Sequence, residues 1–468
     1  MFIFRWRRVL LFFGDFFLFY FSLALALTVR RWGVPGFVFF LEHAGVFSLF
    51  VPVWACTFYI MGLYDLRRIN KTVNLINYSL MAFAANFATV TVFFYIFSAY
   101  LPIAPKTHLL LTFIFLHGFA ALYRRVWTRF FLFKLLAQRV AFLGSNRLVE
   151  EIKSDLDKNP HLGFAVVPLP DLASRQKAGE EYWLPRGRSG GELTGQVDLL
   201  VVDAEDAEKN PFQESAALSA AIMEEIPIIT HLDFYEELYD KIPPEHAAKP
   251  SWLFSNVLHK SNSFYIVVKR GLDVLAAALG LLILSPFFAA AYLALKLSDG
   301  WDKPAFFIQK RIGYLGGKFI IWKFRTMVQG ADKAGPLYEA LADDDRITRV
   351  GRLLRLTRMD ELPQLWNVLK GDMSLVGPRP EWIKEVRILE LSIPHYHLRH
   401  LVKPGMTGWS QINFRATANK QDSLEKLHFD LYYVKNMTLA MDIGIIMRTV
   451  RRVFQRDESF AAEKRARV

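Results

Sequence analysis

Long apolar runs separated by short polar stretches dominate the first 137 residues of the chain. Four of these runs reach the roughly 20 residues needed to cross a bilayer, and they cover residues 9–29, 36–63, 76–101 and 108–126. Lys and Arg are concentrated before the first run and after the second and fourth, which predicts that both ends of the block are cytoplasmic. Arg30 and Arg31 lie on the other side and argue against that orientation. We predict a four-helix transmembrane bundle over residues 1–137, whose first helix is a retained anchor rather than a signal peptide.

A few ionisable residues interrupt these apolar runs: Asp15, Glu42, His43 and His117. Ionisable residues inside a membrane segment are usually functional. Here they are isolated along the sequence and form no evident relay. We favour polar contacts between helices over a transport path, which stays an alternative.

Short apolar segments alternate with a helical pattern between residues 138 and 260. Residues 139–144, 198–203 and 226–230 have the composition of buried strands, and residues 148–156 have helical periodicity. This alternation predicts a small parallel sheet. A dinucleotide site would need Gly-x-Gly-x-x-Gly after the first strand, but only Gly144 is present there. We predict a Rossmann-like module without a cofactor, which serves regulation or subunit contact.

A further apolar run, residues 274–297, is interrupted in its middle by Ser285 and Pro286. Proline kinks a helix, and a serine hydroxyl can satisfy a carbonyl that the kink frees. Basic residues flank the run on both sides, Lys269 and Arg270 before it and Lys296 and Lys303 after it. We predict a re-entrant helix over residues 272–297. The alternative, a kinked spanning helix, would place the rest of the chain outside the cell.

The segment that follows alternates apolar and basic positions. Residues 306–327 predict a short hairpin that presents Lys323 and Arg325 on one face. An acidic triplet, residues 343–345, comes next. We interpret it as a solvated turn or as a structural pair between Asp344 and Arg346, because no strand precedes it as a metal-binding Asp-x-Asp motif would require.

Two adjacent carboxylates, Asp360 and Glu361, stand just ahead of a short amphipathic helix that Pro363 helps to start. The helix dipole favours ionised carboxylates there. Arginines surround the pair in the sequence: Arg352, Arg355, Arg358 and Arg379. A site for a metal-bound phosphate substrate needs acids next to guanidinium groups. For the pair alone, a solvated helix start with surface ion pairs is the simpler interpretation.

Composition supports a membrane protein. Of the 468 residues, 53% are hydrophobic and 41 are Phe, and the formal net charge is +12. Because the basic residues border apolar segments, the charge fits lipid headgroups and phosphate substrates better than nucleic acid. The single cysteine, Cys56, excludes a disulfide framework and a thiol metal site.

The motifs after Lys269 occur in an order that resembles the bacterial sugar transferase family, the monotopic polyprenol-phosphate phosphoglycosyl transferases. The matching pieces begin at Lys269-Arg270, Ser285-Pro286, Lys323-Phe324-Arg325 and Asp360-Glu361-Leu362-Pro363, and continue through Gly377-Pro378-Arg379-Pro380, Lys403-Pro404-Gly405 and Phe429-Asp430. The N-terminal part is similar to the family's large subclass. Residues 301–304 and Phe414 depart from the family pattern, but Arg415 is in place.

The resemblance implies a fold, a reaction and a location. It implies a membrane α+β protein with a mostly helical monotopic catalytic domain over residues 261–468, after the module at 138–260. Family members transfer a sugar 1-phosphate from a UDP-sugar to undecaprenyl phosphate and release UMP, the first membrane step of exopolysaccharide, capsule or O-antigen synthesis. The expected location is the bacterial inner membrane, with the catalytic domain on the cytoplasmic face. The extra domains suggest a homodimer, and no nucleic acid partner is expected.

The resemblance also assigns roles to residues. It makes Asp360 the nucleophile that forms a covalent phosphosugar–aspartyl intermediate, and Glu361 a Mg²⁺ ligand. Arg379 and Pro380 match the nucleotide-binding pair. Further candidate phosphate contacts, each with a surface ion pair as the alternative, are Lys323, Arg325, Arg355 and Arg415. Asp430 matches a family acid for which a structural role is equally open.

Two other functions remain to be weighed. A non-catalytic membrane scaffold on the same fold would not need the intact pair of Asp360 and Glu361 with its phosphate-binding neighbours. A nucleotide-sugar epimerase or reductase would need glycines and a Tyr-x-x-x-Lys pair that the middle module lacks. The sequence does not identify the sugar.

Overall fold

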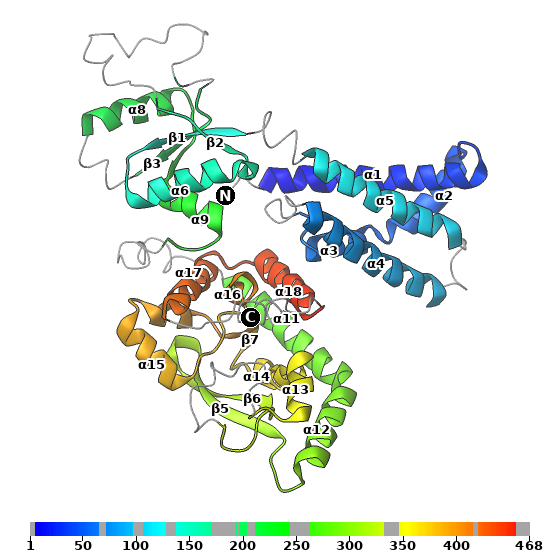
Figure 1. Cartoon of the computed structure of the whole chain (residues 1–468), viewed down its shortest axis with the longest axis vertical. Coiled ribbons are helices and arrows are strands. Elements are labelled where there is room, and N and C mark those ends of the chain that lie inside the picture. The colour runs from blue at the N-terminus through cyan, green and yellow to red at the C-terminus, as the bar shows by residue number, and fades with distance from the viewer. Residues whose placement is uncertain are drawn as a thin grey trace, which may run out of the picture. The chain divides into compact units, whose positions relative to one another are not determined.

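The structure, a computed structural model of the whole chain, is shown in Figure 1. It describes residues 5–64, 72–96, 106–127, 137–169, 193, 196–203, 211–243, 263–331, 346–414 and 420–454. The chain forms two compact units, residues 1–237 and 238–468. We call the second one the C-terminal unit. Most of the described elements are helices, with a few small sheets.

Among the described residues of the first unit, three helices are long and apolar enough to cross a membrane: α1 (Arg5–Arg31), α4 (Thr72–Ile96) and α5 (Lys106–Val126). The remaining predicted span, residues 36–63, is not one straight helix. It consists of α2 (Phe37–Ser48) and α3 (Val51–Ile60), which meet at a bend of 50°. Pro52 lies in the first turn of α3, where proline is tolerated but cannot continue a preceding helix. The pair is therefore a broken span or a re-entrant loop.

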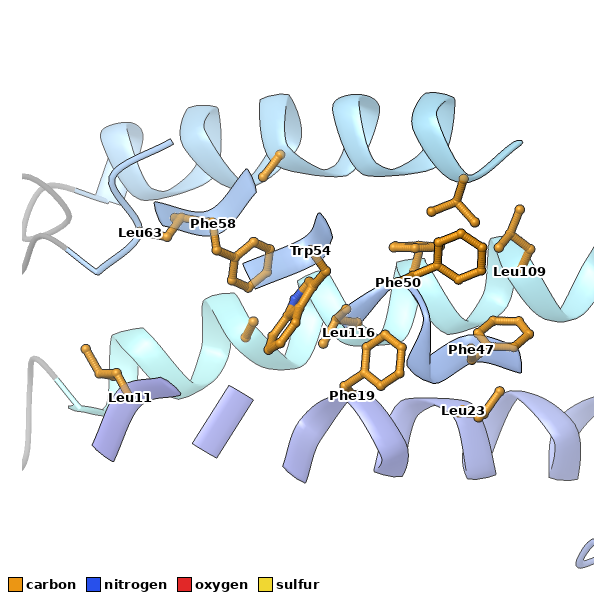
Figure 2. Close-up of a cluster of buried hydrophobic side chains, with 14 of the residues drawn as sticks. Leu11, Phe19, Leu23, Phe47, Phe50, Trp54, Phe58, Leu63, Leu109 and Leu116 are labelled. Carbon is orange, nitrogen blue, oxygen red and sulfur yellow. The ribbon is translucent and has the colours of Figure 1, made fainter. Parts of the chain in front are cut away.

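An aromatic cluster fills the interior of this helical block (Figure 2). The indole of Trp54 lies between Phe19 and Phe58, with ring centroids 5.7 and 5.4 Å away. Apolar residues also cover the outside, where the side chains of Phe13 and Phe17 are 61% and 68% exposed. Helices that are apolar on all sides are typical of membrane segments.

A buried ion pair joins α1 to α5. Arg124 Nη1 and Nη2 donate to the two carboxylate oxygens of Asp15 at 2.8 and 2.6 Å, and both side chains are fully buried. Arg124 Nε also donates to the carbonyl of Leu63 at 2.9 Å. The expectation that Asp15 makes a contact between helices is confirmed. The Arg124 guanidinium is therefore paired inside the block.

The other ionisable residues of the block differ in their surroundings. His117 of α5 contacts Asn86 of α4, with Nε2 and Nδ2 3.4 Å apart. His43 bonds within its own helix to the carbonyl of Phe39 at 2.9 Å. Glu42 lies on an exposed face of α2.

The first unit also contains a four-stranded parallel sheet of order β2-β1-β3-β4. Its strands are β1 (Gln138–Leu143), β2 (Phe164–Val166), β3 (Leu199–Val202) and β4 (Ile228–Thr230). The helices are α6 (Arg147–Lys158), α8 (Pro211–Met223) and α9 (His231–Tyr239), with a 3-10 turn, η2, at Pro160–Leu162. The sequence did not predict β2, which has only three residues.

Alternation along β1 explains why helices cover both faces of this sheet, as Figure 1 shows. Ala141 and Leu143 belong to a core cluster with the alanines of α8. Phe142 points the other way and meets Phe234 of α9, with ring centroids 6.0 Å apart.

The C-terminal unit contains a bent pair of helices, α11 (Ser263–Ile283) and α12 (Ser285–Asp299), which meet at 59°. Pro286 stands in the first turn of α12, and Ser285 Oγ donates to the carbonyl of Leu282 at 2.8 Å. This is the contact that the sequence predicted for Ser285. The helix begins well before residue 272, because its first turns pack on the rest of the unit. Lys269 Nζ, for example, lies 2.7 Å from Asp442 Oδ2.

The rest of the unit alternates short helices with two small sheets. The predicted hairpin is present as β5 (Phe306–Ile312) and β6 (Lys318–Phe324), which pair antiparallel around the turn η4 (Tyr314–Gly316). The acidic triplet at residues 343–345 lies outside the described residues. The elements that follow are α13 (Arg349–Leu356), η7 (Met359–Glu361), α14 (Gln364–Lys370), β7 (Ser374–Val376), α15 (Ile383–Ser392), η8 (Tyr396–Leu401), β8 (Gly405–Thr407), α16 (Trp409–Asn413), α17 (Lys420–Asn436) and α18 (Leu439–Phe454).

The buried pair in the helical block leads to a stability prediction. Asp15→Asn leaves the Arg124 guanidinium buried beside a neutral amide, which typically costs about 3–5 kcal/mol. We expect a clearly lower Tm for this variant in detergent micelles. Glu42→Gln, the same change at an exposed position, serves as the matched control and should leave Tm unchanged. Equal Tm values for the two variants would contradict a stabilising role for the pair.

Candidate active site

Asp360 and Glu361 lie together in the 3-10 turn η7, between α13 and α14. Arg358, with φ of 57°, adopts the left-handed conformation and turns the chain between α13 and η7. Pro363 starts α14, as the sequence predicted. Helix α13 is held close to the end of β6, because Gly351 packs against the backbone of Thr326 and leaves no room for a Cβ. These contacts fix where the two carboxylates stand.

Glu361 is the meeting point of two cations from separate parts of the unit. Its Oε1 accepts from Lys323 Nζ at 2.9 Å and from Arg379 Nη2 at 2.7 Å. Lys323 comes from β6, and Arg379 follows β7. The side chains are 18% exposed for Lys323, 19% for Glu361 and 35% for Arg379, so the cluster lies at the surface but is largely shielded from water.

A buried asparagine aligns β6 with α14 and thereby Lys323 with Glu361. Asn367 Nδ2 donates to the carbonyl of Ile320 at 2.7 Å, and its Oδ1 accepts from the Trp322 amide at 3.1 Å. The Asn367 side chain thus pairs with the strand edge as a neighbouring strand would. The far end of α14 is capped by Arg270 of α11, which donates to the carbonyls of Val368 and Leu369 at 2.6 and 2.9 Å.

Close backbone packing places Arg379. Strands β7 and β8 run parallel, and Gly377 directly follows β7. An added Cβ at Gly377 would overlap the carbonyl oxygen of Lys403, and one at Gly408 would overlap the carbonyl oxygen of Gly377. Glycine at both positions therefore lets these two segments touch, which delivers Arg379 to Glu361.

The two adjacent carboxylates have opposite electrostatics. Burial raises the pKa of Asp360, and the charge of Glu361 raises it further, against the opposing charges of Lys323 and Arg355. Burial alone would also raise the pKa of Glu361, but Arg379 and Lys323 outweigh it and hold this pKa well below its usual range. Burial lowers the pKa of Lys323, although the charge of Glu361 opposes this change.

The carboxylates of Glu361 and Asp360 also differ in their hydrogen bonds. Glu361 is fixed by two cations through one oxygen. Among the described residues, no hydrogen bond or ion pair holds the Asp360 carboxylate. A half-buried carboxylate with a raised pKa, no local partner and nearby positive charge is suited to act as a nucleophile toward a phosphate.

The other predicted site residues lie in different places. Arg325 does not join Lys323 at Glu361, because its Nη2 forms an ion pair with Asp299 Oδ2 at the end of α12, 2.6 Å away. Arg355 Nε donates to Thr326 Oγ1 at 2.9 Å, and the charge of Arg355 acts on Asp360. Pro380 is buried directly after Arg379. Arg415 lies outside the described residues, and Ser285 and Pro286 form the bend between α11 and α12.

The sequence did not identify the residues whose contacts hold the elements of this site in place. Asn367 was recognisable only as a polar residue on the buried face of an amphipathic helix, where it is 1% exposed. The sequence carried no signal for the ion pair of Asp299 with Arg325 or for the capping of α14 by Arg270.

The residues present suit a hard divalent cation. The described part of the chain contains no group of three or more His, Cys, Asp or Glu side chains that could hold a metal alone. Mg²⁺ commonly takes only one or two protein carboxylates together with substrate phosphates. Glu361 meets that requirement, because it stays ionised and both of its hydrogen bonds use Oε1.

Comparison with known proteins identifies the family of this chain. Residues 264–456 match the family profile described as bacterial sugar transferase. The chain is similar to the UDP-N-acetylgalactosamine-undecaprenyl-phosphate N-acetylgalactosaminephosphotransferase of Aeromonas hydrophila, with 37% identity over 55% of this chain and 59% of the relative. It is also similar to the UDP-glucose:undecaprenyl-phosphate glucose-1-phosphate transferase of Escherichia coli strain K12, with 32% identity over 66% of each chain.

The match therefore spans somewhat less than two thirds of the length of these two relatives. A transferase of the same name from Caulobacter vibrioides is 41% identical over 195 residues, which are 41% of this chain and 72% of the relative. The region that matches the family profile contains both Asp360 and Glu361. The chain belongs to the bacterial sugar transferase family, the polyprenol-phosphate sugar-1-phosphate transferases.

Proposed function

We propose that this protein transfers a sugar 1-phosphate from a UDP-sugar to undecaprenyl phosphate and releases UMP. The observation that carries the proposal is the contrast within one pair of acids. Glu361 is ionised and fixed by Lys323 and Arg379, whereas Asp360 has no hydrogen bond or ion pair within the described residues and carries a raised pKa. The names of the relatives, which act on undecaprenyl phosphate, support the same reaction class.

The chemistry would proceed in two displacements at one phosphorus. A carboxylate oxygen of Asp360 attacks the sugar-proximal phosphorus of the donor, and the bond to the UMP oxygen breaks, so UMP leaves. The phosphate oxygen of undecaprenyl phosphate then attacks the phosphosugar–aspartyl intermediate, and Asp360 leaves as a carboxylate. Two such steps replace one difficult transfer between two anions. Lys323, Arg355 and Arg379 supply positive charge next to the reacting phosphate.

Glu361, with the donor's phosphates, would hold Mg²⁺ in this proposal. When bound, the cation neutralises negative charge on the phosphates. Within the chain, Lys323 and Arg379 keep Glu361 ionised and oriented. We propose Arg379 and Pro380 as nucleotide contacts, and Arg325 and Arg415 as further phosphate contacts.

The finer architecture belongs to the same proposal. Residues 1–137 form a four-span membrane block, residues 138–260 a Rossmann-like module without a cofactor, and residues 261–468 the catalytic domain. The bent pair α11–α12 is the re-entrant helix, which keeps the site on the cytoplasmic face of the bacterial inner membrane. Its 59° bend at Ser285 and Pro286 supports this geometry. We propose a homodimer that starts exopolysaccharide, capsule or O-antigen synthesis.

A donor panel tests the proposed reaction. The purified full chain, with undecaprenyl phosphate and Mg²⁺, is assayed for UMP release from UDP-glucose, UDP-galactose and their N-acetylated counterparts. We expect release from at least one donor, its loss on chelation, and its return when Mg²⁺ is added back. If no donor releases UMP, the chain is a non-catalytic scaffold on this fold.

The adjacent acids should respond oppositely to neutralisation. Asp360→Asn removes the nucleophile but relieves the burial of a charge, so we expect activity to fall by at least about a thousandfold with Tm unchanged or higher. Glu361→Gln leaves Lys323 and Arg379 without their anion, so we expect both activity and Tm to fall. The free energy of unfolding should drop by on the order of 2 kcal/mol. UMP release and thermal melting measure the two effects.

Glu390→Gln, at an exposed position of α15, is the matched control for both variants and should change neither quantity. Substantial turnover by a folded Asp360→Asn variant would rule out the covalent aspartyl step. A drop in Tm for Asp360→Asn, larger than that for Glu361→Gln, would contradict the electrostatic assignment.

The raised pKa of Asp360 predicts the acid limb of the pH profile. The nucleophile must be ionised, so kcat/KM should fall as pH drops through a pKa above the ordinary aspartate value of about 3.9. The charge of Lys323 opposes this rise in pKa. We therefore expect Lys323→Met to shift the limb to higher pH, and Lys158→Met, an exposed lysine of α6, to leave it in place. A shift to lower pH in Lys323→Met would refute the assignment.

A further inference from the structure

A fully buried arginine from η8 contacts the backbone that presents Arg379. The Arg399 side chain is 1% exposed, and its Nη2 donates to the carbonyl oxygen of Arg379 at 3.0 Å. The Arg379 side chain leaves this point in the direction of Glu361, which it reaches at 2.7 Å. Arg399 is thus connected to the candidate site through Arg379.

The remaining donors of Arg399 are held by two residues. Nε and Nη2 donate to Asp430 Oδ2 of α17 at 3.1 and 2.6 Å, and Nη1 donates to the hydroxyl of Tyr396 at 3.0 Å. Asp430 is likewise 1% exposed. A planar guanidinium can bind three partners in fixed directions, which an ammonium on a flexible stem cannot do. Asp430 and Tyr396 therefore fix the plane of the Arg399 guanidinium. Its Nη2 consequently donates to the Arg379 carbonyl from a fixed position.

The next two residues are also held in place. Arg311 of β5 donates from Nη1 to the carbonyl of Pro380 at 3.3 Å. The Glu381 side chain forms an ion pair with Lys426 of α17 and lies 3.8 Å from Arg399 Nη1. Residues 379–381 are consequently tied to β5 and η8 through backbone carbonyls and to α17 through the Glu381 carboxylate, while the Arg379 side chain reaches Glu361. A buried ion pair by itself is weak evidence for stability, so this arrangement invites a different explanation.

We propose that Arg399 is a positioning residue for the transfer reaction, oriented by Asp430, and that it acts by fixing the Arg379 backbone so that the Arg379 guanidinium meets Glu361 and the donor phosphate. The proposal rests on the proposed function for its consequence in catalysis. It also gives Asp430, whose role the sequence left open, the task of orienting Arg399 rather than contacting substrate.

A double-mutant cycle on UMP release separates this role from a merely structural one. Arg399→Lys keeps a cation beside Asp430 but cannot bind all three partners. We expect it to lower kcat/KM by about tenfold or more, measured at a temperature at which thermal melting shows the variant to be folded. In an Arg379→Ala background the same change should cost less than about twofold, because Arg399 acts through Arg379. Arg387→Lys, an exposed arginine of α15, is the matched control.

Equal, additive losses in both backgrounds would overturn the proposal. A second readout does not depend on turnover: labelling of arginines in the full chain with phenylglyoxal, followed by peptide mass spectrometry. Arg399→Lys should raise the labelling rate of Arg379 several-fold relative to that of Arg387. An unchanged ratio refutes the positioning role even if the unaltered chain releases no UMP, and that last result refutes the proposed function instead.

Discussion

One carboxylate oxygen organises the C-terminal unit. Glu361 Oε1 accepts hydrogen bonds from a lysine on β6 and an arginine beyond β7, so it joins the antiparallel hairpin to the small parallel sheet. Most of the polar contacts nearby serve this junction. Asn367 aligns α14 with β6, glycines let the segments after β7 and before α16 touch, and Arg270 caps the helix behind the acids. Without Glu361, the two partly buried cations would repel each other.

The same junction divides two chemically identical groups into different tasks. Glu361 receives both cations and stays ionised, and its charge then helps to raise the pKa of its neighbour Asp360. Pairs of carboxylates whose environments move their pKa values apart are a common device for giving each a separate role. Here the difference arises because Lys323 and Arg379 both donate to Glu361 within a single 3-10 turn.

Local patterns predicted much of this structure. Hydrophobic runs located the membrane helices, alternation located the 306–327 hairpin, and Pro363 located the start of α14. The adjacent acids and their arginines were visible as motifs. Two kinds of feature were not predicted. One is the break between α2 and α3, which occurs at a proline inside an apolar run. The other is the pairing of residues that are distant in sequence, such as Arg124 with Asp15 and Arg325 with Asp299.

The bent helix pair also imposes a length constraint. Asp273 of α11 accepts the amide of Leu375 at 3.0 Å, and Asp299 at the end of α12 holds Arg325 at 2.6 Å, so both ends of the apolar stretch are tied to the same unit. From Asp273 to the bend the helix rises about 15 Å, close to half of a hydrocarbon core of about 30 Å. Adding or removing one residue would rotate everything beyond it by about 100°, and Asp299 would no longer face Arg325. The length of the bent pair α11–α12 is therefore set by residue count as firmly as by hydrophobicity.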